Sequence, residues 1–252
     1  MIQEKFNIFK PSLGESSGLF NPSLLSEIHN KSSLMNFLPL TKYLPELTNH
    51  CEDIKTAITN HQNNNGTLYH MVFTARHKRT DNIKILLPKM YRAKQEFWRS
   101  YILKKLRKEL GLKGHVSNVE VTYSDKNGFH PHFHILLFAQ NNLSESYLLD
   151  TFYNVWAKSL RQENLSVNKD CFSLTKGIDN NYLTKLACEV SGNNKGSERG
   201  LSMWGLAHKA MKENSHEYLS LFFKLHEALK GRRMVLWSRV SGASSNASFV
   251  AF

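Results

Sequence analysis

The segment Gly128-Phe-His-Pro-His-Phe-His-Ile-Leu-Leu-Phe138 is the most informative stretch of this chain. Side chains of a β-strand point alternately to its two faces, so His132 and His134 are predicted to share one face and Phe133 to lie on the other. His130 has the same parity, although the proline after it can bend the strand. A lone His-x-His pair is more often a surface feature or a hydrogen-bonded core feature. Three alternating histidines beside an aliphatic run favour a divalent-metal site, because neutral imidazoles are good ligands for such ions.

The residues before this segment predict a partner strand and a third metal ligand. Residues 115–123 alternate as a strand does, and residues 124–128 form a turn with an Asn-Gly pair, so the two strands are expected to form an antiparallel hairpin. Glu120 lies in the middle of the first strand and can face the histidines across the hairpin. A carboxylate also suits harder metals such as Mg and Mn. The alternative is a solvent-facing Glu120 on an exposed sheet face, and Asp125 is a weaker candidate ligand.

Hydrophobic spacing outside the hairpin predicts an α+β domain, with an antiparallel sheet and helices packed on it. Strands are expected at 68–76, 171–175 and 232–238. Helices are expected at 81–110, with Pro88 in its first turn or at its true start, and at 143–162, 180–190, 201–212 and 216–230.

The composition indicates a nucleic-acid partner. The chain has 252 residues and a formal net charge of +12, and such a surplus points to a polyanion. No apolar run is long enough to span a membrane, and the N-terminus lacks an apolar signal core, so we expect a cytoplasmic protein with no membrane partner. The three scattered cysteines fit neither a disulfide framework nor a zinc ribbon.

The charge is unevenly distributed along the chain. Residues 1–66 hold five Lys and six acidic residues, a net of −1, so the remaining residues carry +13. This first part is expected to be an extension, partly helical near 47–59 and ending in a polar linker at 60–66. Residues 241–252 are expected to be a tail. No internal repeat is present.

Most of the positive charge follows the first strand of the domain. Residues 76–113 contain thirteen basic and three acidic residues, and we expect them to contact DNA phosphates as a strand guide beside the histidines. The alternative is an ordinary solvated helix face. The candidate DNA-binding residues are Arg76, Lys78, Arg79, Arg92, Arg99, Lys104, Lys105, Arg107, Lys108, Lys195, Arg199, Arg232 and Arg233.

The histidine strand resembles the second motif of the rolling-circle replication initiators of small plasmids and phages, which belong to the HUH endonuclease superfamily. His132-Phe133-His134 corresponds to the HUH triplet (His–hydrophobic–His). Residues 71–77 resemble the first motif of this family and residues 182–189 the third, tyrosine-bearing motif. The resemblance covers roughly residues 68–240 and implies an HUH domain at 67–240, whereas residues 1–66 resemble nothing we can name.

The resemblance implies a site-specific DNA nickase. In such enzymes a tyrosine attacks a scissile phosphodiester, forms a 5′-phosphotyrosine link and frees a 3′-OH that primes synthesis. His132, His134, Glu120 and, less directly, His130 would hold Mn2+ or Mg2+. The expected substrate is single-stranded or hairpin origin DNA, with a host helicase and polymerase as partners, while the oligomeric state is left open.

The position of the nucleophile departs from the family pattern. The third motif often has Tyr directly after Lys, but here Leu186 follows Lys185. Tyr182 lies four residues before Leu186, so on a helix it shares that face one turn earlier. We therefore expect Tyr182 as nucleophile and Lys185 as a phosphate contact. The alternative is a Tyr182 that packs on the sheet, and Tyr153 and Tyr218 are further candidates.

Other functions are compatible with the same residues. A conjugative relaxase or a single-tyrosine transposase would use the same chemistry in another role. A non-catalytic nucleic-acid-binding protein with a sheet platform would bind tightly, be indifferent to chelator and cleave nothing. A structural zinc domain is disfavoured because paired cysteines are missing.

Overall fold

The computed structural model describes residues 44–177 and 200–238, with side chains from Asp53 onward. In chain order its elements are α3 (Leu44–Asn63), β1 (Thr67–Phe73), α4 (Ile83–Arg99), α5 (Tyr101–Glu109), β2 (Leu112–Ser124), β3 (Gly128–Ala139), α6 (Glu145–Gln162), a 3-10 turn η3 (Lys169–Cys171), β4 (Phe172–Lys176), α8 (Met203–Glu213), α9 (His216–Leu229) and β5 (Val235–Ser238). The expected α+β class is confirmed. None of the helices in these two stretches is both long and apolar enough to cross a membrane.

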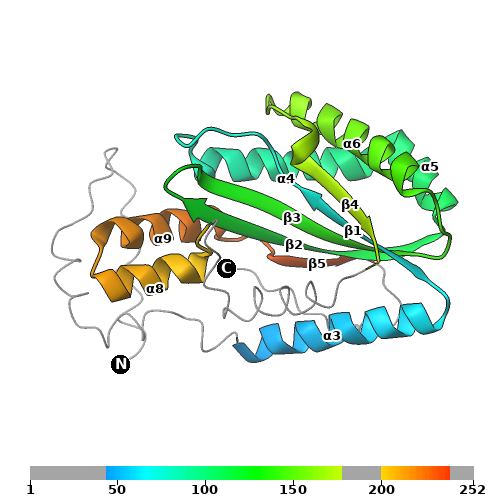
Figure 1. The fold of residues 1–252 in the computed structure, drawn as a ribbon, viewed down its shortest axis with the longest axis horizontal. Helices are drawn as coiled ribbons and strands as arrows, with labels where there is room; N and C mark the ends of the chain where they lie inside the picture. Colours follow the sequence, from blue (N-terminus) through cyan, green and yellow to red (C-terminus); the bar gives the residue numbers. More distant parts are fainter. Residues whose placement is uncertain (1–43, 178–199, 239–252) are drawn as a thin grey trace. The chain divides into compact units, whose positions relative to one another are not determined.

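The strands form one antiparallel sheet with the order β4-β1-β3-β2-β5 (Figure 1). The predicted β2–β3 hairpin therefore lies in the middle of the sheet, and β1 pairs with the edge of β3 that faces away from β2. The turn between the two strands ends at Gly128, whose φ of +71° is a left-handed conformation that glycine adopts without strain. β2 pairs with the whole histidine segment and β1 with its part from Phe133 onward, and these ladders fix its register.

One face of the sheet carries the apolar core. The side chain of Phe73 contacts Phe97 of α4 and Trp156 of α6, with ring centroids 4.7 Å apart in both pairs. Phe133 of β3 is fully buried on the same face and meets Tyr91 of α4. The helices α4 and α6 therefore cover the odd-numbered side chains of β3 (Figure 1).

The even-numbered side chains of β3 lie on the opposite face, and α3 covers one end of it. The His61 side chain of α3 hydrogen bonds the Ala139 carbonyl oxygen at 2.9 Å, and its ring packs edge-on against Phe138. Ile54 and Ala57 of α3 are buried as well. This face holds the candidate site.

Several predicted element boundaries are wrong. The basic helix 81–110 is two helices, because Ser100 leaves the helical conformation and its hydroxyl accepts a hydrogen bond from the Leu103 amide, capping α5. Pro88 lies inside α4 rather than in its first turn. Residues 60–63 of the expected linker continue α3, and the turn follows them, with Asn65 at positive φ. The last strand begins at Val235 instead of residue 232.

Candidate metal centre

The register of the β2–β3 hairpin brings the predicted ligands together on one face. Glu120 pairs with His132, and Asn118 pairs with His134. Directly paired residues of an antiparallel ladder share a face and are near neighbours. The cross-strand placement predicted for Glu120 is therefore confirmed, although its role as a ligand stays a prediction.

The Glu120 carboxylate contacts His134, which lies two residues along β3 from its paired residue His132. Its Oε2 atom lies 3.0 Å from Nε2 of His134, and the two side chains are only 11% and 9% exposed. Little water reaches the pair, so the carboxylate fixes the orientation of the imidazole. This is the usual relation between a carboxylate and a functional histidine.

Two histidines that sequence reasoning missed extend the site into a row of five imidazoles. His70 of β1 stacks on His134 with ring centroids 5.6 Å apart, and its Nε2 lies 3.4 Å from Nδ1 of His134. At the other end, His77 hydrogen bonds His130 through its Nε2 atom. His130 in turn contacts His132 at a centroid distance of 4.2 Å.

The missed pair carried only weak signals in the sequence. His70 belongs to this face because it is two residues from Val72, which pairs with His134 across the β1–β3 ladder. That register involves strands more than fifty residues apart and cannot be read from local alternation. His77 lies in the loop of residues 74–82, named the β1–α4 loop below, where strand parity gives no guidance.

The backbone that leads into the histidine strand is held from β1. Thr74 donates its hydroxyl proton to the Pro131 carbonyl oxygen at 2.9 Å, and the Thr74 carbonyl oxygen accepts a bond from the Trp156 indole N–H at 2.9 Å. Pro131 has no amide proton for the ladder, so the threonine side chain anchors the chain where a regular strand bond is missing. Thr74, within the segment 71–77 that resembles the first motif, therefore positions the backbone of the strand that carries the histidines.

The environment favours neutral imidazole at His130. Burial, with the neighbouring His77 adding to it, lowers the pKa of His130 to about 4, while Glu120 acts in the opposite direction. At neutral pH this ring is uncharged, which is the form that coordinates metal ions.

The donor set suits a divalent ion in chemistry and register. A carboxylate and neighbouring imidazoles on one sheet face are the ligands that Mn2+ and Zn2+ accept. Among residues 44–177 and 200–238, however, no three His, Cys, Asp or Glu side chains converge as a metal site requires. In this arrangement Glu120 and His134 bond each other directly. Binding an ion therefore requires these side chains to turn from each other toward it.

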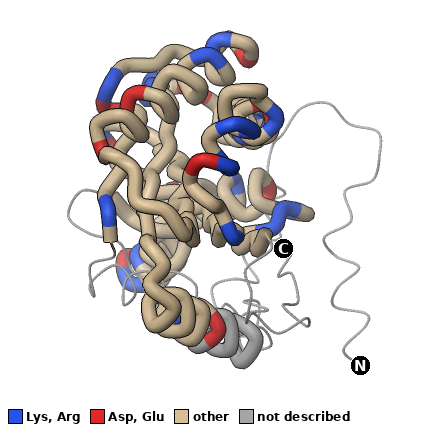
Figure 2. The backbone as a smooth tube through the Cα atoms, turned by 90° about the vertical axis from the view of Figure 1, so that its right-hand side faces the viewer, with Lys and Arg blue, Asp and Glu red and all other residues tan. Residues whose placement is uncertain are grey.

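The basic helices do not lie beside the histidines, contrary to expectation. Lys94 and Phe97 of α4 reach Ser117 and Phe73 on the core face, which is the far side of the sheet from His134. In Figure 2 most Lys and Arg lie in the upper half of the view, on the side of α4, α5 and α6, and few lie toward α3. A strand guide beside the site is therefore not formed by these helices. Their contact with DNA elsewhere stays a prediction.

Several of the predicted DNA-binding cations have partners within the protein. Arg92 pairs with Glu163 at 2.8 Å, Arg99 with Glu96 at 3.0 Å and Lys105 with Glu109 at 3.8 Å. Arg107 lies over the Trp98 ring at 4.9 Å, and Arg232 donates to the Ala228 carbonyl oxygen at 2.9 Å. Lys104, Lys108 and Arg233 are exposed.

The β1–α4 loop carries three exposed cations close in sequence to His77, which contacts the histidine row. Arg76, Lys78 and Arg79 are exposed there, and His77 between them contacts His130. Contact of these three residues with DNA beside the site stays a prediction. They replace the helices as the candidate strand guide.

The predicted nucleophile lies outside the part of the chain that the structure describes. This holds for Tyr182, Lys185, Lys195 and Arg199, and for the expected helix at 180–190. Of the other candidate tyrosines, Tyr218 of α9 accepts a hydrogen bond from Lys209 at 2.7 Å, and Tyr153 is half-buried on α6, a helix of the core face. Neither is on the strand that carries the histidines.

Comparisons with known proteins leave the family open. The chain matches no protein-family model, and no curated protein is significantly similar to it. What the geometry provides is a half-buried row of imidazoles with one carboxylate, on the face of the sheet opposite its helical layer.

Proposed function

We propose that this protein is a site-specific DNA nickase of the HUH type that initiates rolling-circle replication of a plasmid or phage. The observation that carries the proposal is the pairing of Glu120 with His132 in the central hairpin, next to His134. A hairpin with the His-Phe-His triplet on one strand and a carboxylate on its partner is the arrangement that the resemblance implies. The five-stranded antiparallel sheet is compatible with it.

The proposed chemistry begins with the Tyr182 phenol. Its oxygen attacks the scissile phosphorus, the bond from phosphorus to the 3′ oxygen breaks, and a 5′-phosphotyrosine and a free 3′-OH result. A phenol with a pKa of ~10 is a weak nucleophile at neutral pH, so the phosphate must be activated. A bound Mn2+ or Mg2+ would supply that activation by neutralising charge on the phosphate oxygens.

The chain's own residues have defined parts in this proposal. His132, His134 and Glu120 would hold the ion, and His70, stacked on His134, would keep that ring in place. Lys185 would contact the phosphate. The exposed cations of the β1–α4 loop would position the strand at the histidine row.

The direct test is formation of a covalent adduct. The protein is incubated with Mn2+ and hairpin-containing oligonucleotides and then analysed by denaturing electrophoresis. We expect a slower-migrating protein–DNA adduct that disappears in Tyr182→Phe and in chelator. An undiminished adduct in Tyr182→Phe would move the nucleophile elsewhere, and mass spectrometry of the trapped peptide would locate it.

A non-catalytic nucleic-acid-binding protein is the second candidate. It is favoured by one observation, namely that no three metal-binding side chains converge within residues 44–177 and 200–238. Under this alternative, DNA binding is unchanged by chelator and no substrate gives an adduct. The same electrophoresis experiment therefore separates the two functions.

A further inference from the structure

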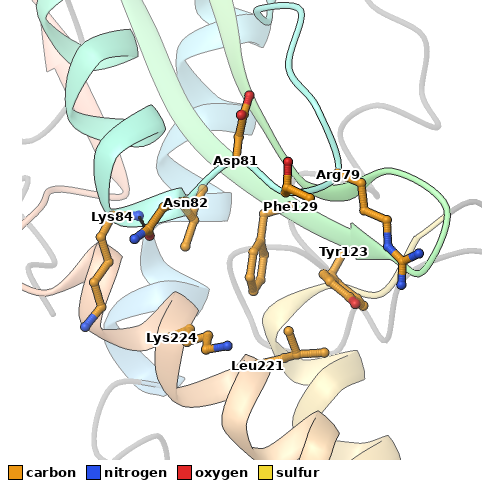
Figure 3. A pocket seen from close by; sticks show the side chains of 10 residues that line it. Arg79, Asp81, Asn82, Lys84, Tyr123, Phe129, Leu221 and Lys224 are labelled. Carbon is orange, nitrogen blue, oxygen red and sulfur yellow. Dashed lines mark hydrogen bonds between the residues drawn. The ribbon is translucent and has the colours of Figure 1, made fainter. Parts of the chain in front are cut away.

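A pocket with aromatic and cationic walls lies at the turn end of the β2–β3 hairpin, apart from the histidine row. Its volume is about 470 Å³, within the range of about 300–1,000 Å³ that is typical of small-ligand sites. It is bounded by the end of the β1–α4 loop and the start of α4, by the hairpin and by α9 (Figure 3).

The apolar wall consists of two aromatic rings. Phe129 of β3 and Tyr123 of β2 each line the pocket and are each 8% exposed. Their ring centroids are 5.0 Å apart, and Leu221 of α9 lies opposite them (Figure 3). Tyr123 is held in place because its backbone forms two hydrogen bonds with Leu201, of 2.8 and 2.7 Å. The two ring planes are inclined at 60°, so a flat ligand that stacks on one ring meets the other with its edge.

The residues that line the pocket include three cations and one carboxylate. Burial raises the pKa of the Tyr123 hydroxyl, and the carboxylates of Asp125 and Glu217 lie close enough to Tyr123 to add to this effect. Arg79 and Lys224 are exposed at the rim. Lys84 also lines the pocket, and its Nζ atom lies 3.7 Å from Oε2 of Glu227, a residue that does not line it. The Asp81 carboxylate accepts a hydrogen bond from the Lys78 amide at 2.9 Å. The charged residues that line the pocket are therefore net positive, and the pocket is apolar within.

This combination selects the chemical class of the ligand. A ligand that has both a flat aromatic part and an anionic part fits the ring wall and the cationic rim at once. Aromatic walls bind nucleobases by stacking, without need of a particular base, and Arg and Lys bind phosphate. An acidic peptide would leave the aromatic wall unused.

The β1–α4 loop joins this pocket to the histidine row. His77 contacts His130, and two residues further along the loop Arg79 lines the pocket. The loop is tight against the hairpin, since a Cβ at Gly128 would meet the Arg79 carbonyl oxygen at 2.5 Å. A strand that follows the loop therefore passes from one site to the other.

We propose that this pocket binds one nucleotide, with the base against Phe129 and Tyr123 and the phosphate at Arg79 and Lys224. The nucleotide belongs either to a single strand held for nicking or to a free nucleotide. Only the choice of single-stranded DNA as a probe rests on the proposed function, since the pocket itself requires no cleavage.

The test measures binding without chemistry. The full-length protein in EDTA is titrated against single-stranded oligonucleotides that carry 2-aminopurine at successive positions, and against free dAMP as competitor. We expect strong fluorescence quenching at one position, because stacking on an aromatic ring quenches this base. Competition by dAMP would assign the pocket to free nucleotides, and competition by unlabelled oligonucleotide alone would assign it to a strand.

Three variants give the test its specificity. The double variant Arg79→Ala/Lys224→Ala is expected to weaken binding about tenfold, and Phe129→Leu to abolish the position-specific quenching while keeping the apolar volume. The control Lys158→Ala/Lys169→Ala removes the same charge from exposed lysines that do not line the pocket, and is expected to weaken binding less than about twofold. Equal weakening by both pairs, or unchanged quenching in Phe129→Leu, would overturn the proposal.

The outcome is independent of nicking. If the wild-type protein forms no adduct, and the double variant Arg79→Ala/Lys224→Ala binds DNA more weakly than the wild type, the nickase would be refuted and the nucleotide pocket kept. If the pocket variants bind DNA with wild-type affinity and still form the adduct, the nucleotide pocket would be refuted and the nickase kept.

Discussion

Glu120 faces His132 across the central hairpin, while its carboxylate oxygen lies 3.0 Å from the imidazole of the neighbouring His134. The same carboxylate residue thus neighbours both histidines of the His-Phe-His triplet, and its side chain is only 11% exposed. Such a group is costly to bury without a cationic or hydrogen-bonding partner. The arrangement makes Glu120 the residue whose replacement tests the proposed function most directly.

We predict that Glu120→Gln lowers the rate of adduct formation about a hundredfold or more and weakens Mn2+ binding. The amide keeps the size and one hydrogen bond to His134 but removes the negative charge that an ion requires. Isothermal titration with Mn2+ and quantified adduct gels are the measurements.

The matched control is Glu96→Gln, which removes a carboxylate from α4, on the other side of the sheet. It should leave both measurements unchanged. A Glu120→Gln protein that nicks at the wild-type rate would show that this carboxylate is structural.

The second prediction concerns which cations guide the strand. Arg76→Ala/Lys78→Ala in the β1–α4 loop should slow adduct formation at subsaturating DNA about tenfold and make the salt dependence of DNA binding shallower, by about 0.7 per lost contact to single-stranded DNA. Lys104→Ala/Lys108→Ala removes the same charge from α5 and should change the rate little, because α5 lies in the helical layer across the sheet from the histidines (Figure 1). The reverse ranking would restore the basic helices as the guide.

The hairpin could be predicted from sequence because all of its determinants are local. Alternation placed His132 and His134 on one face, the turn residues set the register, and that register put Glu120 opposite His132. The α+β class followed from the order of the elements. None of this needed information from distant parts of the chain.

The features that could not be predicted depend on contacts between distant segments. Strand parity says which side chains share a face, but not which face a helix will cover, so the basic helix was expected on the wrong side. His70 joins the site only through the pairing of β1 with β3. The break at Ser100 was hidden by apolar positions that continue at helical spacing on both sides.

The third prediction concerns the tight contact under the hairpin turn. Gly128→Ala should lower the free energy of unfolding by more than about 2 kcal/mol, because the new Cβ meets the Arg79 carbonyl oxygen at 2.5 Å and the φ of +71° is strained for alanine. Urea denaturation followed by circular dichroism measures this loss. Gly231→Ala is the control, with the same kind of φ, +72°, and no atom within 4 Å of the new Cβ. It should cost about 1 kcal/mol, and equal losses would show that strain alone acts at both sites.

The fourth prediction uses a histidine outside the candidate site. His115 is buried against the Trp98 ring, and burial, followed by the charges of Lys94 and Arg107, lowers its pKa to about 3. The folded protein therefore holds this ring neutral down to about pH 3, whereas the unfolded chain protonates it near pH 6.5. Its contribution to stability is present above pH 6.5 and is lost as the pH falls toward 3. His115→Phe keeps an aromatic ring against Trp98 and should unfold less steeply with acid between these two values. Identical acid profiles would show that His115 is not the group responsible.

The last prediction concerns Lys94, whose amine is buried over the Phe133 ring at 4.4 Å and lies 3.4 Å from the Ser117 hydroxyl. Burial lowers the pKa of Lys94 to about 8, from 10.5 in the unfolded chain, so at pH 7 the folded state carries an unfavourable buried charge. Lys94→Met keeps the length of the side chain without the charge, and should raise the free energy of unfolding at pH 7 by up to about 3 kcal/mol.

This gain should depend on pH in a defined direction. Between pH 8 and 10.5 the folded wild type loses the proton from Lys94 while the unfolded chain keeps it, so the wild type gains stability and the advantage of Lys94→Met shrinks. Urea denaturation at pH 7, 9 and 10 measures both states. Lys158→Met, at an exposed position of α6, is the control and should show no such trend. A Lys94→Met variant that is less stable at every pH would mean that the contacts of the ammonium group with Phe133 and Ser117 outweigh the cost of burying its charge.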